Sequence, residues 1–379
     1  MSRAGVYIHI PFCRARCSYC DFATGQYEGA LADAYVRAVA REVSCFGGDG
    51  EGARVDTVYF GGGTPSLLTP AQVEHLLASV RRRFRVEAGA EVTMEMNPGT
   101  LTPDTLRAFR AAGVNRASFG AQTFDDGELR RLGRTHTADD TRRTLRDLRA
   151  AGFDNVSFDL IAGLPQQTLA AWSRNLEEAL SLGPEHLSLY LLEVHEGTPL
   201  AEQIRQGRYE TPDADLAAEM YQLLVARTRA EGYEQYEISN FARPGRESRH
   251  NLKYWTGAPF YGFGCSSHSF DGRHTRWSNE RDSRRYVELV EGRGDAVVER
   301  TELDARAAGA EALFLGLRLL RRGVDLREHR ARFGADVRAE YEDDLRRFNE
   351  AGLVELEGDT LRLTPRGALL SNEVFAAFV

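Results

Sequence analysis

The chain has 379 residues, of which 42% are hydrophobic and 27% are charged, and this size predicts a globular protein with one large core and a smaller one. Its formal net charge of −8 excludes a general electrostatic attraction to nucleic acid. No stretch approaches the roughly 18 apolar residues of a membrane-spanning helix and no signal peptide is recognisable, so we expect a cytoplasmic protein for which peripheral membrane contact stays open.

The first predicted strand, VYIHI at 6–10, leads into three closely spaced cysteines. Cys13, Cys17 and Cys20 have the spacing C-x3-C-x2-C in the segment IPFCRARCSYCDF. Iron–sulfur clusters are normally held by four thiolates, so a set of three indicates a four-iron cluster with one iron left for another ligand.

Two alternatives to a cluster stay open for these thiols. A zinc ion could use them with His9 as its fourth ligand. Disulfides are the other alternative, which a chain with five cysteines and no sign of secretion does not favour. Cys45 and Cys265 stand apart from the group, and we expect both to be buried, unreactive thiols.

Short β-rich runs alternate with amphipathic helical patterns along the first half of the chain. Thr69-Pro70, Thr102-Pro103 and Thr211-Pro212 each place a capping hydroxyl before a proline at a helix start. Such units predict a parallel sheet with right-handed crossovers, either curled into a partial barrel of six units or open and doubly wound. The six predicted strands are at 6–10, 55–60, 90–96, 115–120, 155–161 and 186–192.

Glycine and polar residues gather where these strands end. GGGTPS at 61–66 follows the second strand, and Glu95, Gln122 and Asp159 lie at the ends of the third, fourth and fifth. Parallel α/β folds bind their ligands at the carboxyl ends of strands. The three glycines remove side chains where a ligand approaches, and we expect their free N–H groups to meet a carboxylate.

The chain changes character after about residue 300. Helical patterns at 305–321 and 336–351 precede two alternating runs joined by Gly358-Asp359, which predict a hairpin. A further helix is expected from Thr364. These elements predict a winged-helix-like α+β domain. Its basic and acidic residues nearly balance, so a docking or substrate-covering role is favoured over DNA binding.

Six segments carry a resemblance that covers nearly the whole chain: YIHIPFC, YFGGGTPS, EMNPGT, RASFGAQTF, LGRTHT and DLIAGLPQQT. They resemble the motifs of the radical S-adenosylmethionine (SAM) family of oxygen-independent coproporphyrinogen III oxidase-like proteins, most of all its HemW branch of haem chaperones. The resemblance implies a partial (βα)6 radical SAM barrel in residues 1–232, a barrel extension in 233–300 and the winged-helix-like domain in 301–379.

By this resemblance the three cysteines hold a 4Fe–4S cluster that SAM completes. Arg134 offers a fork to the methionine carboxylate, and Glu95 and Asp159 accept hydrogen bonds from ribose hydroxyls. Tyr19, between two of the cysteines, packs on the adenine. The SAM-binding residues that the resemblance implies are Tyr7, Tyr19, Gly62, Gly63, Thr64, Glu95, Gln122, Arg134 and Asp159.

The segment HNLKYW at 250–255 resembles the HNxxYW signature of the haem-chaperone branch. The resemblance implies a haem site with His250 as axial ligand, and Tyr254 and Trp255 offer flat apolar surface to a macrocycle. His268 and Cys265, in FGCSSHSF, are competing ligands.

Two functions stay open. A haem chaperone would deliver haem to respiratory haem proteins, with homodimerisation undecided. A coproporphyrinogen III dehydrogenase of porphyrin biosynthesis would instead cleave SAM to a 5′-deoxyadenosyl radical and decarboxylate its substrate. The decarboxylating enzymes carry another cysteine two residues after the third and usually a longer N-terminal extension. Phe22 occupies that position here, so the chaperone is favoured, and whether SAM is cleaved stays undecided.

Overall fold

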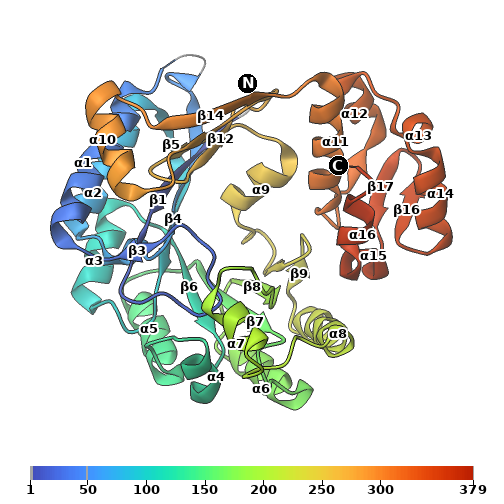
Figure 1. Cartoon of the computed structure of the whole chain (residues 1–379), viewed down its shortest axis with the longest axis horizontal. Helices are drawn as coiled ribbons and strands as arrows, with labels where there is room; N and C mark the ends of the chain where they lie inside the picture. Colours follow the sequence, from blue (N-terminus) through green and yellow to red (C-terminus); the bar gives the residue numbers. More distant parts are fainter. Residues whose placement is uncertain (1–2, 48–49, 379) are drawn as a thin grey trace.

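Six parallel strands pair side by side in chain order, in a computed structural model that describes residues 3–47 and 50–378. This order excludes the doubly wound alternative, in which the strand order reverses. The sheet curls, and helices cover its outer face (Figure 1). The predicted α/β fold class is therefore confirmed. The strands are β1 (Ala4–Ile10), β4 (Arg54–Gly62), β5 (Arg85–Met96), β6 (Arg116–Gln122), β7 (Val156–Ala162) and β8 (His186–Leu191).

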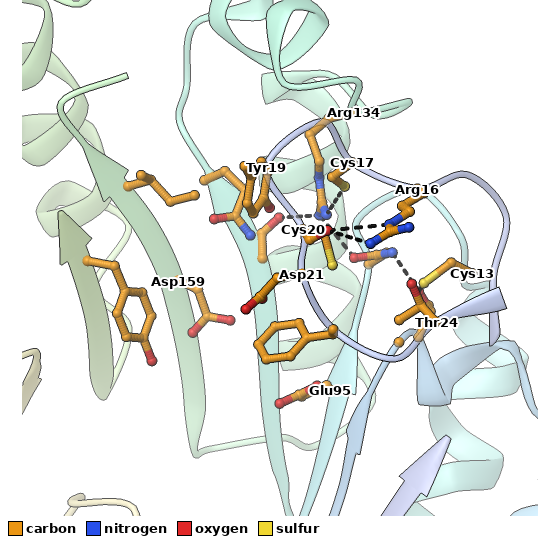
Figure 2. Close-up of a pocket in the computed structure, with 18 of the residues that line it drawn as sticks. Cys13, Arg16, Cys17, Tyr19, Cys20, Asp21, Thr24, Glu95, Arg134 and Asp159 are labelled. Carbon is orange, nitrogen blue, oxygen red and sulfur yellow. Dashed lines mark hydrogen bonds between the residues drawn. The ribbon is translucent and has the colours of Figure 1, made fainter. Parts of the chain in front are cut away.

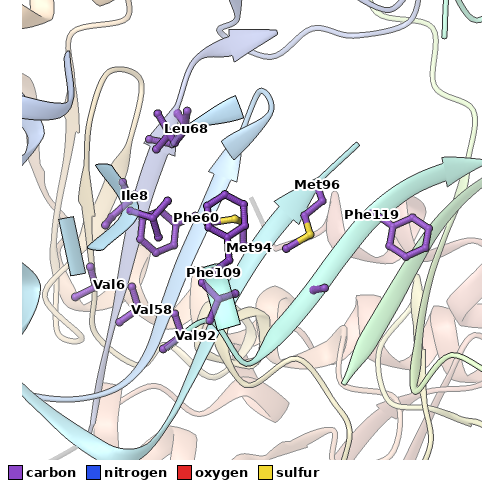
Figure 3. Packing of buried hydrophobic residues seen from close by; sticks show 14 of the residues in the cluster. Val6, Ile8, Val58, Phe60, Leu68, Val92, Met94, Met96, Phe109 and Phe119 are labelled. Carbon is purple, nitrogen blue, oxygen red and sulfur yellow. The ribbon is translucent and has the colours of Figure 1, made fainter. Parts of the chain in front are cut away.

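Alternate residues of each strand face opposite sides of the sheet. Apolar side chains such as Val6, Phe60 and Met94 point to the helices and form the main core (Figure 3). Polar side chains such as Tyr59 and Glu95 occupy the positions between them and face the inside of the curl, which we call the lumen. The covering helices are α1 (Gly29–Cys45), α2 (Pro70–Arg83), α3 (Pro103–Ala112), α4 (Asp126–Arg131), α5 (Ala138–Ala150), α6 (Leu169–Ser181) and α8 (Ala214–Ala230).

Two of the three predicted helix starts are confirmed. Thr69 caps α2 in a capping box with Gln72, and Thr102 caps α3. The prediction at Thr211-Pro212 is wrong, because the carboxylate of Asp213 accepts two backbone N–H bonds and α8 begins at Ala214. Cys45 was also predicted wrongly: it ends α1 at the surface and is exposed, whereas Cys265 is buried.

The sheet continues beyond both edges of the six strands. β10 (Asn240–Ala242) and β9 (Glu234–Gln235) extend it past β8, and β11 (Phe260–Phe263) pairs in parallel with β1. Helix α9 (Arg249–Thr256) packs against β1 and β4 between the barrel and the last domain (Figure 1). The remaining elements here are β12 (His268–Phe270), β13 (Thr275–Asn279), α10 (Ser283–Arg293) and β14 (Val297–Glu302).

The C-terminal domain has a separate core and a three-stranded antiparallel sheet. Two predicted helices are shorter than expected: the first ends at Leu317, and the second breaks at Tyr341, whose ring packs on Phe378. The elements are α11 (Ala305–Leu317), β15 (Val324–Asp325), α12 (Leu326–Phe333), α13 (Val337–Glu340), α14 (Glu342–Glu350), β16 (Val354–Glu357), β17 (Thr360–Leu363), α15 (Pro365–Leu369) and α16 (Ser371–Phe375). Within the described ranges, no helix has the length and apolar character needed to cross a membrane.

Candidate functional site

A cavity of about 420 Å³ opens at the carboxyl ends of the parallel strands. It brings together residues from the cysteine loop, the glycine turn and four strand ends (Figure 2). The predicted cluster and SAM residues that line it are Cys13, Cys17, Tyr19, Cys20, Gly62, Gly63, Thr64, Glu95, Gln122, Arg134 and Asp159. Tyr7 does not line the cavity.

The cysteine loop is held against the segment that follows α4. Its first part pairs as β2 (Phe12–Cys13) with β3 (Gly25–Gln26). The backbone N–H of Ser18 donates to the carbonyl of Leu132 at 2.9 Å, and the guanidinium of Arg16 donates to the carbonyl of Cys20. These bonds position the cysteines and the nearby Arg134 as one unit.

Two hydrogen-bond donors face the thiols. The Thr64 hydroxyl lies 3.6 Å from Cys13 Sγ, and Arg134 Nη1 lies 3.4 Å from Cys17 Sγ. Burial raises the pKa of Cys13 and Cys20, which favours the neutral thiols in the free protein. A metal cluster reverses this preference, because coordinating thiols are deprotonated.

The zinc alternative receives no support from the geometry. His9 is buried, and its ring bonds the hydroxyl of Tyr7 and the carbonyl of Ala23. Throughout residues 3–47 and 50–378, no three His, Cys, Asp or Glu side chains converge on a site for a single metal ion. A four-iron cluster does not require the thiols to converge on one point, since its thiolates bind separate irons.

Two partly buried carboxylates form the wall opposite the thiols. Glu95 accepts hydrogen bonds from the Tyr59 hydroxyl at 2.8 Å and the Gly62 N–H at 3.0 Å. Asp159 accepts from the Ser118 hydroxyl at 3.4 Å. Burial raises the pKa of Glu95 to about 7 and raises the pKa of Asp159, so both side chains are short of compensating charge.

Arg134 crosses between the thiols and the strand ends. Its Nη2 donates to the Asn97 side-chain oxygen at 2.9 Å and to the Gly120 carbonyl at 2.7 Å. A Cβ at Gly120 would lie 3.1 Å from this guanidinium and 2.3 Å from the Gln122 amide, so a larger residue would displace these side chains. The next cavity residue, Gln122, has a φ of 63°, a backbone strain of the kind that gathers at functional sites.

The expectation of free N–H groups in the glycine turn is wrong. The Gly62 N–H donates to Glu95, the Gly63 N–H to the carbonyl of Ile10, and the Thr64 N–H to the carbonyl of Phe12. A Cβ at Gly62 would lie 2.5 Å from the His9 ring. These glycines therefore admit neighbouring protein atoms and fix the turn, and a ligand carboxylate would have to use other donors.

The two predicted SAM-site tyrosines lie in different places. Tyr19 is half-buried at the cavity and packs with Leu132, Ile161, Leu164 and Leu192. Tyr7 faces the lumen below the cavity, where its hydroxyl bonds His9 and its ring stacks on Tyr59.

The HNLKYW segment forms α9 and lies away from this cavity. His250 is 1% exposed; its Nδ1 bonds the Thr57 hydroxyl at 2.9 Å and its Nε2 bonds the Tyr254 hydroxyl at 3.0 Å. Burial lowers the pKa of His250 to about 3. The Trp255 ring is covered by the Arg318 guanidinium at 4.3 Å. Of the competing ligands, His268 is exposed on β12 and Cys265 is buried.

Asn97 was indicated as a residue that ends the third strand, and no role was predicted for Tyr59, Ser118 or Tyr190. Asn97 and Ser118 bind Arg134 and Asp159, Tyr59 binds Glu95, and Tyr190 lines the cavity mouth. All four follow the two-residue spacing of lumen-facing positions or end a strand. Each lies near a residue that the sequence did indicate, so this spacing could have identified them.

Comparisons with known proteins show the family and the fold. The profile of the Radical SAM superfamily matches residues 7–179, and that of the HemN C-terminal domain matches residues 303–370. The heme chaperone HemW of Bacillus subtilis is 36% identical over 98% of both chains, and that of Mycobacterium tuberculosis H37Rv is 39% identical over 98% of this chain and 93% of its own. Coproporphyrinogen III oxidase (HemN) of Escherichia coli, a radical SAM enzyme, superposes with a TM-score of 0.86 at 24% identity over 100% of this chain and 90% of its own, which shows a shared fold.

Proposed function

Because the chain belongs to the HemW family of radical SAM proteins, we propose that it is a haem chaperone that binds a 4Fe–4S cluster, SAM and haem and delivers haem to respiratory haem proteins. One observation carries the proposal: three cysteines, an arginine and two carboxylates share one cavity at the carboxyl ends of the strands. A cytoplasmic location and a homodimer stay predictions.

The residues present fit a cluster with three protein ligands. Cys13, Cys17 and Cys20 would hold it through their thiolates, and the Thr64 hydroxyl and Arg134 guanidinium would donate to two of those sulfurs. A bound four-iron cluster supplies one-electron chemistry at the iron that the thiolates leave free.

The opposite wall suits SAM, which carries a positive sulfonium, an amino group and a carboxylate. Arg134 supplies the charge for the carboxylate, and Glu95 and Asp159 supply acceptors for the hydroxyl groups and the cationic part. Tyr19, with its apolar neighbours, supplies a surface for the adenine.

In this proposal, α9 provides the haem-binding residues. Both nitrogens of His250 carry hydrogen bonds, so ligation of haem iron through Nε2 requires release of the Tyr254 hydroxyl. Access to Trp255 likewise requires Arg318 to leave the indole face. The proposed haem state therefore involves a rearrangement of α9 against the C-terminal domain.

The test titrates haem into anaerobically reconstituted protein and follows its absorption band. His250→Ala should abolish or strongly shift the band while the iron–sulfur signal remains. Tyr254→Phe should bind haem at least as tightly as the unmodified protein, because it removes the partner of Nε2. His268→Ala is the control and should leave the band unchanged.

Transfer and catalysis are then measured on the same samples. Haem-loaded protein should pass haem to an apo haem protein of the respiratory chain, and coproporphyrinogen III should persist in the presence of SAM and reductant. Normal haem binding by His250→Ala together with coproporphyrinogen decarboxylation would replace the chaperone by the dehydrogenase.

A further inference from the structure

Arg116 is a buried cation in the lumen without a direct partner. It begins β6, is 2% exposed and is among the largest fully buried side chains. Its Nε has no hydrogen-bond partner, and no carboxylate in the described part of the chain forms an ion pair with it. Burying a guanidinium without an ion-pair partner costs free energy of folding. We therefore expect this charge to have a role in function.

The strand register places Arg116 directly beneath the carboxylate wall. Arg116 pairs with Thr93 of β5, and two residues further on Ser118 pairs with Glu95. Side chains two apart on a strand face the same side, so Arg116 shares the lumen face with Ser118, Gly120 and Gln122. The last three of these line the SAM cavity, and Arg116 lies one layer below them.

The two carboxylates of that wall need a counter-charge. Burial raises the pKa of Glu95 and of Asp159, and the charge of Asp159 raises the pKa of Glu95 further. The positive charge of Arg116 acts in the opposite direction on both. Two acidic groups in one lumen do not both ionise readily near neutral pH unless a cation is close.

We propose that Arg116 is a positioning residue for SAM, supplying from beneath the charge that keeps Glu95 and Asp159 ionised and ready for a cationic ligand. This inference rests on the proposed binding of SAM in the cavity. The lack of a direct bond follows from the role: a guanidinium paired to either carboxylate would occupy the oxygens that the ligand needs.

Few other lumen groups change charge between pH 6 and 9. Burial lowers the pKa of His250 and His186, which stay neutral there. Arg134 stays charged, and Glu237 is paired with Arg318. Loss of surrounding water raises the pKa of the five tyrosines that face this region, Tyr7, Tyr59, Tyr190, Tyr236 and Tyr254. At the cavity mouth, His195 lies near Asp21 and Glu193, so it needs its own control.

The experiment measures SAM affinity of the reconstituted protein by calorimetry from pH 6 to 9. Arg116→Met should weaken binding about tenfold at pH 7 and move the midpoint of its pH dependence up by about one unit. Arg116→Lys should restore most of the affinity and the midpoint. His195→Asn should leave the midpoint where it is.

Stability separates a positioning role from a structural one. Ligand-free Arg116→Met should unfold in urea at a concentration no lower than the unmodified protein, because it removes a buried unpaired cation. An unchanged midpoint for SAM binding in Arg116→Met, or a loss of stability shared by Arg116→Lys, would overturn the proposal.

Loss of SAM binding and loss of the role of Arg116 give different experimental results. If the unmodified protein binds no SAM at any pH, the proposed function fails. The carboxyl groups are then titrated in ligand-free protein by infrared difference spectroscopy, where Arg116→Met should still raise the ionisation midpoint. If SAM binds and Arg134→Ala abolishes it while Arg116→Met changes nothing, only the role of Arg116 is wrong.

Discussion

The thiols of Cys13, Cys17 and Cys20 face a cavity in which the nearest polar contacts are donors. Thr64 and Arg134 bond two of the sulfurs, and Arg134 in turn holds Asn97 and Gly120. A guanidinium in this position favours thiolates once a cluster binds. The cavity is thus suited to a group that carries negative charge on sulfur.

Replacement of any one of the three cysteines by Ala should abolish the cluster. Anaerobically reconstituted protein should carry about four irons and four sulfides per chain, because three thiolates and SAM complete the cubane. Iron and sulfide analysis with electron paramagnetic resonance measures the loss. Cys45→Ala, an exposed thiol outside the cavity, is the matched control and should retain full iron. Stoichiometric zinc with no iron would contradict the prediction.

Glu42 gives a pH dependence of stability that is separate from the site. This α1 carboxylate accepts hydrogen bonds from the Gly264 N–H, the Asn279 amide and the Tyr286 hydroxyl. Burial raises its pKa from 4.5 to about 7, although these hydrogen bonds work against the shift. Between these two values the folded chain holds a proton that the unfolded chain has lost, so stability falls as pH rises.

Glu42→Gln should remove this contribution. The difference in free energy of unfolding between the variant and the unmodified protein should move in favour of the variant by about 1–3 kcal/mol as pH rises from 5 to 8. Urea unfolding at several pH values measures it. Parallel pH profiles for the two proteins would mean that Glu42 is ionised throughout.

At the scale of elements, the sequence predicted the repeated features and missed the isolated ones. All six barrel strands and the caps at Thr69 and Thr102 were predictable, because alternation and capping act over a few neighbouring residues. Strand β15 has only two residues and depends on pairing with β17, which gives no local signal.

The same distinction holds for the candidate sites. The cysteine loop was predictable because its three thiols are close in sequence. The environment of His250 was not, because its Nδ1 partner, Thr57, is 193 positions away. Arg116 was not singled out either, since an arginine at the start of a strand resembles a surface residue until the fold places it beneath Glu95.

At the scale of the molecule, the C-terminal domain is joined to the barrel through Arg318. This residue pairs with the fully buried carboxylate of Glu237 at 3.2 Å and covers Trp255. Ile238 also packs into the core of the C-terminal domain. An ion pair with a fully buried carboxylate therefore links the two parts close to the proposed haem segment.

Arg318→Ala should destabilise the protein by about 3 kcal/mol or more, because the buried Glu237 carboxylate loses its counter-charge and keeps only hydrogen bonds from the Ser239 N–H and the Asn240 amide. It should also shift the fluorescence of Trp255 to longer wavelength. Arg321→Ala is the matched control: its pair with Glu234 is exposed, so its removal should cost less than about 1 kcal/mol. Equal effects of the two variants in thermal unfolding would contradict the assignment.

The pairing of β1 with both β4 and β11 has a consequence for the order in which the protein is completed during synthesis. One edge of β1 can pair early, with residues 54–62 of β4. The other edge can pair only after residues 260–263 of β11 have been synthesised. The cysteine loop follows β1 directly, so on the ribosome its supporting strand is half-paired until more than two thirds of the chain has emerged. Domains form as units only when their distant segments meet. The strand that supports the cysteine loop is accordingly completed late in the life of the nascent chain.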